Sequence, residues 1–96
     1  MNVTIQAINF VATEKLKVFI DKKAERLQRH HPELTTVDVK MTVVKPESAN
    51  NKEVVLKAVQ PSNEFVATKT ADTFEEAIDL ALDALSKMLE KTKDKK

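Results

Sequence analysis

Glycine and cysteine are both missing from this sequence of 96 residues. Without glycine, the chain cannot form a P-loop, a dinucleotide-binding fingerprint or a glycine-rich nucleophile elbow. Its tight turns must instead use Pro, Asn, Asp or Ser. Without cysteine, disulfides and thiolate metal sites are excluded. These two absences remove several large classes of enzyme and metalloprotein.

Tryptophan and tyrosine are absent too, and four phenylalanines are the only aromatic residues. A base-stacking platform is therefore not expected, and any RNA contact should be made mainly to phosphates and to shape. No apolar run approaches the roughly 18 residues of a membrane span. The first residues also lack the basic and apolar regions of a signal peptide. We therefore expect a cytoplasmic protein with no membrane partner.

Groups suited to catalysis are few. His30 and His31 are the only histidines, and because they are adjacent they point in different directions and cannot form a helical metal-binding pair. We expect His31 to pack at a helix end and His30 to lie on the surface. Most carboxylates fall on solvated helix faces, where the raised pKa of an acid–base catalyst is not expected. The sequence thus predicts no enzyme, no metal, no cofactor and no small-molecule substrate.

Hydrophobic periodicity predicts a single α+β domain over residues 1–96, with the order β-α-β-β-β-α. The predicted strands cover residues 2–10, 35–45, 53–60 and 65–70, and the predicted helices cover 14–30 and 73–92. A right-handed crossover makes the first two strands parallel, and the last two form a hairpin. Both helices then pack on one face of a four-stranded sheet. We expect them to bury Leu16, Ile20, Leu27, Phe74, Ile78, Leu82 and Leu85.

The ends of the helices carry capping signals. Thr13 is suited to cap the first helix, and Pro32 ends it. Asp72 or Thr73 is suited to cap the second helix, since each has a glutamate three residues later, as in a capping box.

The charges of the first helix are sorted by face, although the 16 basic residues of the chain nearly cancel its 15 acidic ones. Glu14, Asp21 and Glu25 share one flank at about 100° per residue. The other flank, which we call the basic stripe, contains Lys15, Lys22, Lys23, Arg26, Arg29 and His30. Such a stripe can follow phosphates. It can equally be a solvated face with pairs such as Glu25–Arg29, and the pattern leaves both readings open.

The second predicted helix begins with acidic residues and ends with basic ones. The helix dipole alone explains that order. Lys87 and Lys91 do share a face, four residues apart, where like charges repel slightly. RNA binding is one reason why both Lys87 and Lys91 are present despite this repulsion.

Two stretches resemble the short hibernation-promoting factor and ribosome-associated inhibitor family, whose older label is sigma-54 modulation protein. The first runs from Asn9-Phe10-Val11-Ala12-Thr13-Glu14 through Ile20-Asp21-Lys22-Lys23 to Leu27-Gln28-Arg29-His30. The second runs from Glu64-Phe65-Val66-Ala67 into Ala71-Asp72-Thr73-Phe74-Glu75-Glu76-Ala77-Ile78-Asp79 and Ala81-Leu82-Asp83-Ala84-Leu85. With the strands between them, the similarity covers the whole chain. The chain departs from the family pattern at Lys69, Glu75, Ala84 and Glu90, and the last three make the second helix less basic.

The resemblance implies a fold similar in shape to double-stranded-RNA-binding domains. It also implies binding to rRNA phosphates of the small ribosomal subunit, in the mRNA and tRNA channel, and silencing of translation in stress or stationary phase. The RNA-binding residues that it implies here are Lys22, Lys23, Arg26, Arg29, Lys87 and Lys91.

Long family members carry a C-terminal dimerisation domain, and we expect none in this chain. We therefore expect a monomer, or a weak dimer through a sheet-face patch of Val44, Val55 and Val59. Two alternatives to ribosome binding remain open. The chain could be a protein-interaction module that modulates a transcription factor, or a generic module that binds structured RNA.

Overall fold

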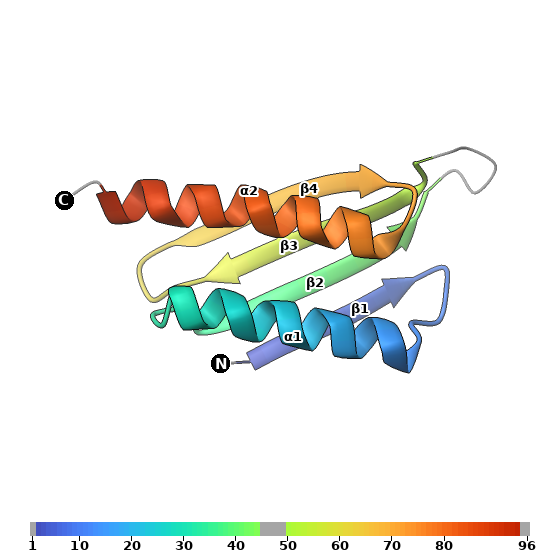
Figure 1. The fold of residues 1–96 in the computed structure, drawn as a ribbon, viewed down its shortest axis with the longest axis horizontal. Coiled ribbons are helices and arrows are strands. Elements are labelled where there is room, and N and C mark those ends of the chain that lie inside the picture. The colour runs from blue at the N-terminus through green and yellow to red at the C-terminus, as the bar shows by residue number, and fades with distance from the viewer. Residues whose placement is uncertain (1, 45–49, 95–96) are drawn as a thin grey trace.

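A computed structural model describes residues 2–44 and 50–94 of the chain (Figure 1). The predicted class and element order are confirmed. The end of the predicted strand over 35–45, and part of the loop expected after it, lie outside the described residues. The elements are β1 (Asn2–Ile8), α1 (Glu14–His30), β2 (Thr36–Val43), β3 (Lys52–Val59), β4 (Glu64–Ala71) and α2 (Phe74–Asp94).

The four strands form one sheet in the order β1-β2-β3-β4. β1 and β2 are parallel, whereas β2, β3 and β4 are joined by antiparallel pairing. Both helices lie on one face of this sheet and begin at the same end of it, so that they run side by side in the same direction (Figure 1). The parallel run places the second half of α1 next to the middle of α2.

Asparagine takes over the role that glycine plays in most turns. Asn9 has φ 69° and Asn50 has φ 56°, and asparagine is one of the few residues that tolerate this left-handed conformation. The prediction that the first strand extends to residue 10 is therefore wrong, because the left-handed turn at Asn9 ends β1 at Ile8.

The core lies between the sheet and the two helices. Ile20 and Ile78 are each 1% exposed and Leu85 is 0% exposed, and they pack on sheet residues such as Met41 and Val54. Six of the seven predicted helix core residues are buried. Leu82 is the exception, because it is only half-buried and lines a groove between the helices.

Both helices start at a threonine. The Thr13 hydroxyl accepts a hydrogen bond from the backbone N–H of Leu16 at 3.1 Å, and the Thr73 hydroxyl accepts one from that of Glu76 at 3.1 Å. Thr73, rather than Asp72, therefore caps α2. Asp72 instead accepts a hydrogen bond from the backbone N–H of Asn50 at 2.7 Å. α2 extends to Asp94, two residues beyond the predicted end.

The sheet face away from the helices is mixed rather than apolar. Val55 and Val59 are half-buried on it, but Lys57, which lies between them in β3, pairs with Glu64 at 3.5 Å. Val44 is half-buried just after the end of β2. Together with the polar residues around them, these valines do not form a large apolar patch.

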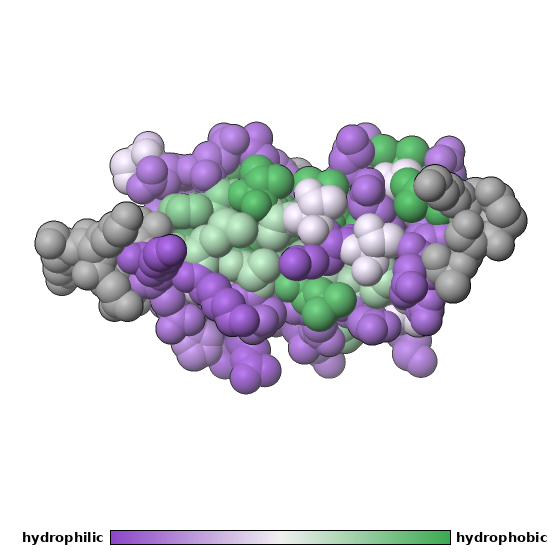
Figure 2. All heavy atoms as spheres, turned by 90° about the horizontal axis from the view of Figure 1, so that it is seen from above, coloured by the Kyte–Doolittle hydropathy of each residue, from purple (hydrophilic) through white to green (hydrophobic). Residues whose placement is uncertain are grey.

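A clearer apolar strip follows the outer edge formed by α2 and β4. Figure 2 shows this side of the molecule from above, with apolar side chains gathered along its middle and polar ones around them. Leu80 and Met88 of α2 are exposed hydrophobic residues on this side, whereas the exposed Val66 of β4 pairs in register with Lys57 and so lies on the sheet face away from the helices. In the described residues, no helix is long and apolar enough to cross a membrane.

Candidate nucleic-acid interface

The basic stripe is a real surface feature of α1. Lys22, Arg26 and Arg29 are exposed, and Lys23 is half-buried where α1 faces α2. Glu14, Asp21 and Glu25 are also exposed, on the other flank of the helix as the periodicity predicts. Basic and acidic residues thus occupy different flanks of α1, and the flanks meet at Glu25 and Arg29.

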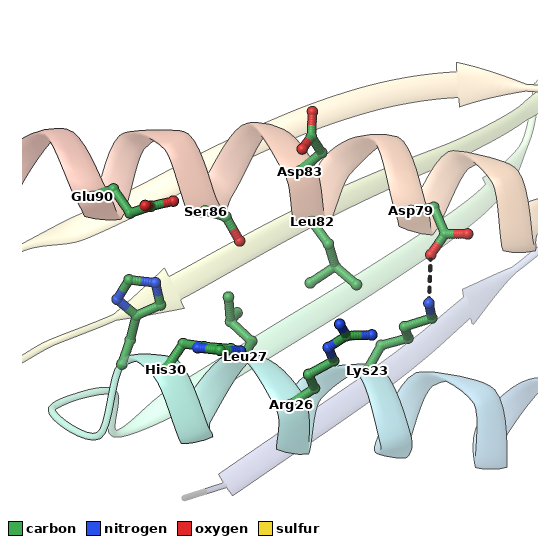
Figure 3. Close-up of a pocket in the computed structure, with 10 residues that line it drawn as sticks. Lys23, Arg26, Leu27, His30, Asp79, Leu82, Asp83, Ser86 and Glu90 are labelled. Carbon is green, nitrogen blue, oxygen red and sulfur yellow. Dashed lines mark ion pairs between the residues drawn. The ribbon is translucent and has the colours of Figure 1, made fainter.

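A groove of about 640 Å³ lies between the second half of α1 and residues 79–90 of α2 (Figure 3). Leu27 and Leu82 give it an apolar floor, and Ser86 adds a hydroxyl group. Its remaining lining residues are polar or charged, and they are Lys23, Arg26, His30 and His31 from the side of α1, and Asp79, Asp83 and Glu90 from α2. One wall is therefore basic and the other acidic.

One ion pair spans the groove at its end nearest the start of the helices. The Lys23 Nζ lies 3.1 Å from Asp79 Oδ1, as the dashed line in Figure 3 marks. The same ammonium group lies 5.3 Å from the centre of the Phe19 ring, within the range of a cation–π contact. Lys23 is therefore held by two groups, one on each helix.

Two other predicted RNA-binding residues are paired within their own helix. Arg29 lies 3.2 Å from Glu25, which confirms the predicted spacing of that pair, and Lys87 lies 3.2 Å from Asp83. All four side chains are at least two-thirds exposed, so each pair contributes little to stability. A phosphate group can replace a partner held this weakly.

The remaining predicted residues carry unpaired charge. Within residues 2–44 and 50–94, Lys22, Arg26 and Lys91 make no ion pair. Lys22 and Arg26 lie close together on α1. Lys91 and Lys87 are exposed on α2, but neither is among the residues that line the groove. The structure thus concentrates the candidate site on α1.

His31 ends α1 and is 4% exposed, with its backbone N–H donating to the carbonyl groups of Leu27 and Gln28. It packs at the helix end, as expected, and His30 lies on the surface. In the part of the chain that the structure describes, no three His, Asp or Glu side chains gather closely enough to hold a metal ion.

The acidic wall of the groove was missed at the sequence level. The helix dipole explains why Asp79 and Asp83 lie toward the start of α2, but it does not explain Glu90 near the end or the face that these residues share. A helical projection does carry the signal, because Asp79, Asp83, Ser86 and Glu90 recur every three or four residues and so share one face. A projection of α2 alone does not show that this face lies opposite Lys23 and Arg26 of α1.

Comparisons with known proteins agree with this fold. The family model described as "Sigma 54 modulation protein / S30EA ribosomal protein" matches residues 3–96. A ribosome hibernation promoting factor from Azotobacter vinelandii is 32% identical over 95 residues, which cover 99% of this chain and 85% of that protein.

Two solved structures share the fold at lower identity. A ribosomal subunit interface protein from Coxiella burnetii superposes with a TM-score of 0.88 at 21% identity, over 99% of this chain and 100% of that one. The N-terminal domain of Protein Y from Thermus thermophilus gives 0.81 at 18% identity, over 96% of this chain and 99% of that one.

Proposed function

The chain belongs to the family of sigma 54 modulation proteins and S30EA ribosomal proteins, a non-enzymatic family, and from this membership we propose that it binds ribosomes and silences translation. In this proposal the partner is the small ribosomal subunit in the cytoplasm, and the site is the channel that mRNA and tRNAs occupy. Binding there blocks translation by occupying that channel during stress or stationary phase. No chemical step is required.

The basic stripe is the observation that carries the proposal. Lys22 and Arg26 are exposed, lie on one flank of α1, and have no ion-pair partner among the described residues. Side chains in this state attract phosphate groups without first losing a contact. Because the chain has no tryptophan or tyrosine and only four phenylalanines, the contact is made mainly to the rRNA backbone, and it reads the shape of the RNA rather than its bases.

α1 carries more of this contact than α2. Lys87 is already paired with Asp83, and Asp79, Asp83 and Glu90 face the groove with negative charge that repels phosphates. Lys91 adds one cation on the exposed side of α2. Arg29 and Lys23 join the contact only when they exchange a carboxylate for a phosphate.

Sedimentation with purified ribosomal subunits tests the proposal. The chain should pellet with the small subunit in low salt and be released in high salt, because contacts to phosphate displace counterions. tRNA and mRNA should compete for the site. Binding that is insensitive to salt would instead indicate a protein contact. Binding to any structured RNA without competition by tRNA would indicate a generic RNA-binding module.

A further inference from the structure

We propose that Asp79 limits the affinity of the chain for RNA, because its carboxylate occupies the ammonium group of Lys23 and must be displaced before that lysine can meet a phosphate. This inference rests on the proposed function. It assigns a role in setting affinity to an acidic residue of α2 that does not itself contact RNA.

The geometry singles out this pair. Lys23–Asp79 joins α1 to α2 at 3.1 Å, whereas Glu25–Arg29 and Asp83–Lys87 each lie within one helix. The Lys23 side chain is 34% exposed, against 72% for Arg29, whose partner lies on its own helix. A charge that is less exposed is less screened by solvent, so its pairing is harder to replace.

The surroundings of Lys23 give the direction of the effect. The Phe19 ring lies 5.3 Å from the ammonium group and already helps to fix its position on α1, without neutralising its charge. Asp79 does neutralise it. With Asp83 and Glu90 on the same wall, Asp79 also adds negative potential beside Arg26, which lines the other wall. Removing the carboxylate therefore frees one cation and weakens repulsion of an approaching phosphate.

The test compares Asp79→Asn with Asp21→Asn in binding to purified small subunits across a range of salt concentrations. Both changes remove one carboxylate from an exposed aspartate, but Asp21 lies on the acidic flank of α1 and has no ion pair among the described residues. Asp79→Asn should tighten binding about three- to tenfold near 0.1 M salt. It should also steepen the slope of log affinity against log salt by about 0.7–0.9, as for one more phosphate contact. Asp21→Asn should change affinity less than about twofold, with an unchanged slope.

A double-mutant cycle with Lys23→Gln separates this role from a general effect of charge. In the Lys23→Gln background, Asp79→Asn should lose most of its effect on affinity and all of its effect on the salt slope. Asp79→Glu, which can rebuild the pair, should behave like the wild type. A circular dichroism melt of each variant checks that the fold is unchanged.

The outcomes separate this inference from the proposed function. If the wild-type chain does not bind the small subunit, the proposed function fails. If the wild type binds and Asp79→Asn binds equally well or more weakly, the proposed function stands and the inference is wrong. Weaker binding would mean that Asp79 orients Lys23 toward the RNA instead of withholding it.

Discussion

The rings of Phe10 and Phe74 stack on each other, with centroids 4.4 Å apart and planes 15° apart. Phe10 lies in the connection between β1 and α1, whereas Phe74 is the first residue of α2. The stack therefore ties together two segments that are distant in sequence, at the end of the sheet where both helices begin (Figure 1).

A double-mutant cycle with Phe10→Leu and Phe74→Leu should measure this stack. Each change keeps an apolar side chain but removes a ring. The coupling free energy from urea unfolding should be about 0.5–1.5 kcal/mol, the usual value of an aromatic pair beyond its buried area. Additive effects of the two substitutions would show that the rings contribute only as buried surface.

Asn9 should be replaceable by glycine but not by a β-branched residue. Its φ of 69° is open to glycine at no steric cost, whereas a β-branched side chain is strained there. We expect Asn9→Gly to leave the free energy of unfolding within about 0.5 kcal/mol, and Asn9→Val to lower it by about 1–2 kcal/mol. Equal melting temperatures for the two variants would contradict a left-handed turn at this position.

Leucines of α2 should rank by burial when each is replaced by alanine. Leu85 is 0% exposed, and Leu85→Ala should cost about 2–5 kcal/mol as a core truncation. Leu80 is 45% exposed, and Leu80→Ala should cost less than about 1 kcal/mol. Leu82→Ala should fall between them, since Leu82 is half-buried. Chemical denaturation of the three variants measures the loss in free energy of unfolding. A loss for Leu80→Ala as large as that for Leu85→Ala would mean that the core-facing side of α2 is assigned wrongly.

The fold could be predicted from the sequence because each element has a clean hydrophobic period. The bounds of α1 are predicted to the residue, since Thr13 caps its start and Pro32 follows its end. The errors in the predicted core and strand ends occur where tertiary contacts or a turn, and not hydrophobic periodicity, determine the structure. Leu82 has the spacing of a core residue, but it is only half-buried because it lines the groove between the two helices. The left-handed turn at Asn9 has no periodic signal at all.

The candidate site could be predicted only on one helix at a time. The period of α1 separates its basic and acidic flanks correctly, and the Glu25–Arg29 pair follows from spacing. The Lys23–Asp79 pair does not, because it depends on how α1 and α2 are placed side by side over the sheet. A sequence pattern predicts which residues share a face of one helix, but only the packing of the two helices determines which residues that face contacts.

The chain should be monomeric, and Lys69 should help to keep it so. Lys69 pairs in register with the buried Val54, so it lies on the helix side of β4, an edge strand of the sheet. A charge placed there discourages pairing with another edge strand beside the apolar strip of α2 and β4. Light scattering should show a monomer for the wild type and increased self-association for Lys69→Val. A wild-type dimer that persists on dilution would overturn the monomer prediction.

Two pairs of charge reversals distinguish a basic stripe that binds the small ribosomal subunit from one that is only a solvated helix face. Lys22→Glu with Arg26→Glu removes two unpaired cations, while Glu14→Lys with Asp21→Lys reverses two charges on the opposite flank. Lys22 and Arg26 are both exposed, so replacing them should change the free energy of unfolding by less than about 0.5 kcal/mol.

The deciding measurement is the affinity of these two double variants for purified small subunits as a function of salt. Lys22→Glu with Arg26→Glu should abolish binding and the inhibition of translation in vitro, whereas Glu14→Lys with Asp21→Lys should bind at least as tightly as the wild type. Each lost phosphate contact should also lower the salt slope by about 0.7–0.9. If the Lys22→Glu, Arg26→Glu variant is folded and binds with the wild-type affinity and salt slope, the basic stripe is only a solvated helix face and the small subunit is bound elsewhere.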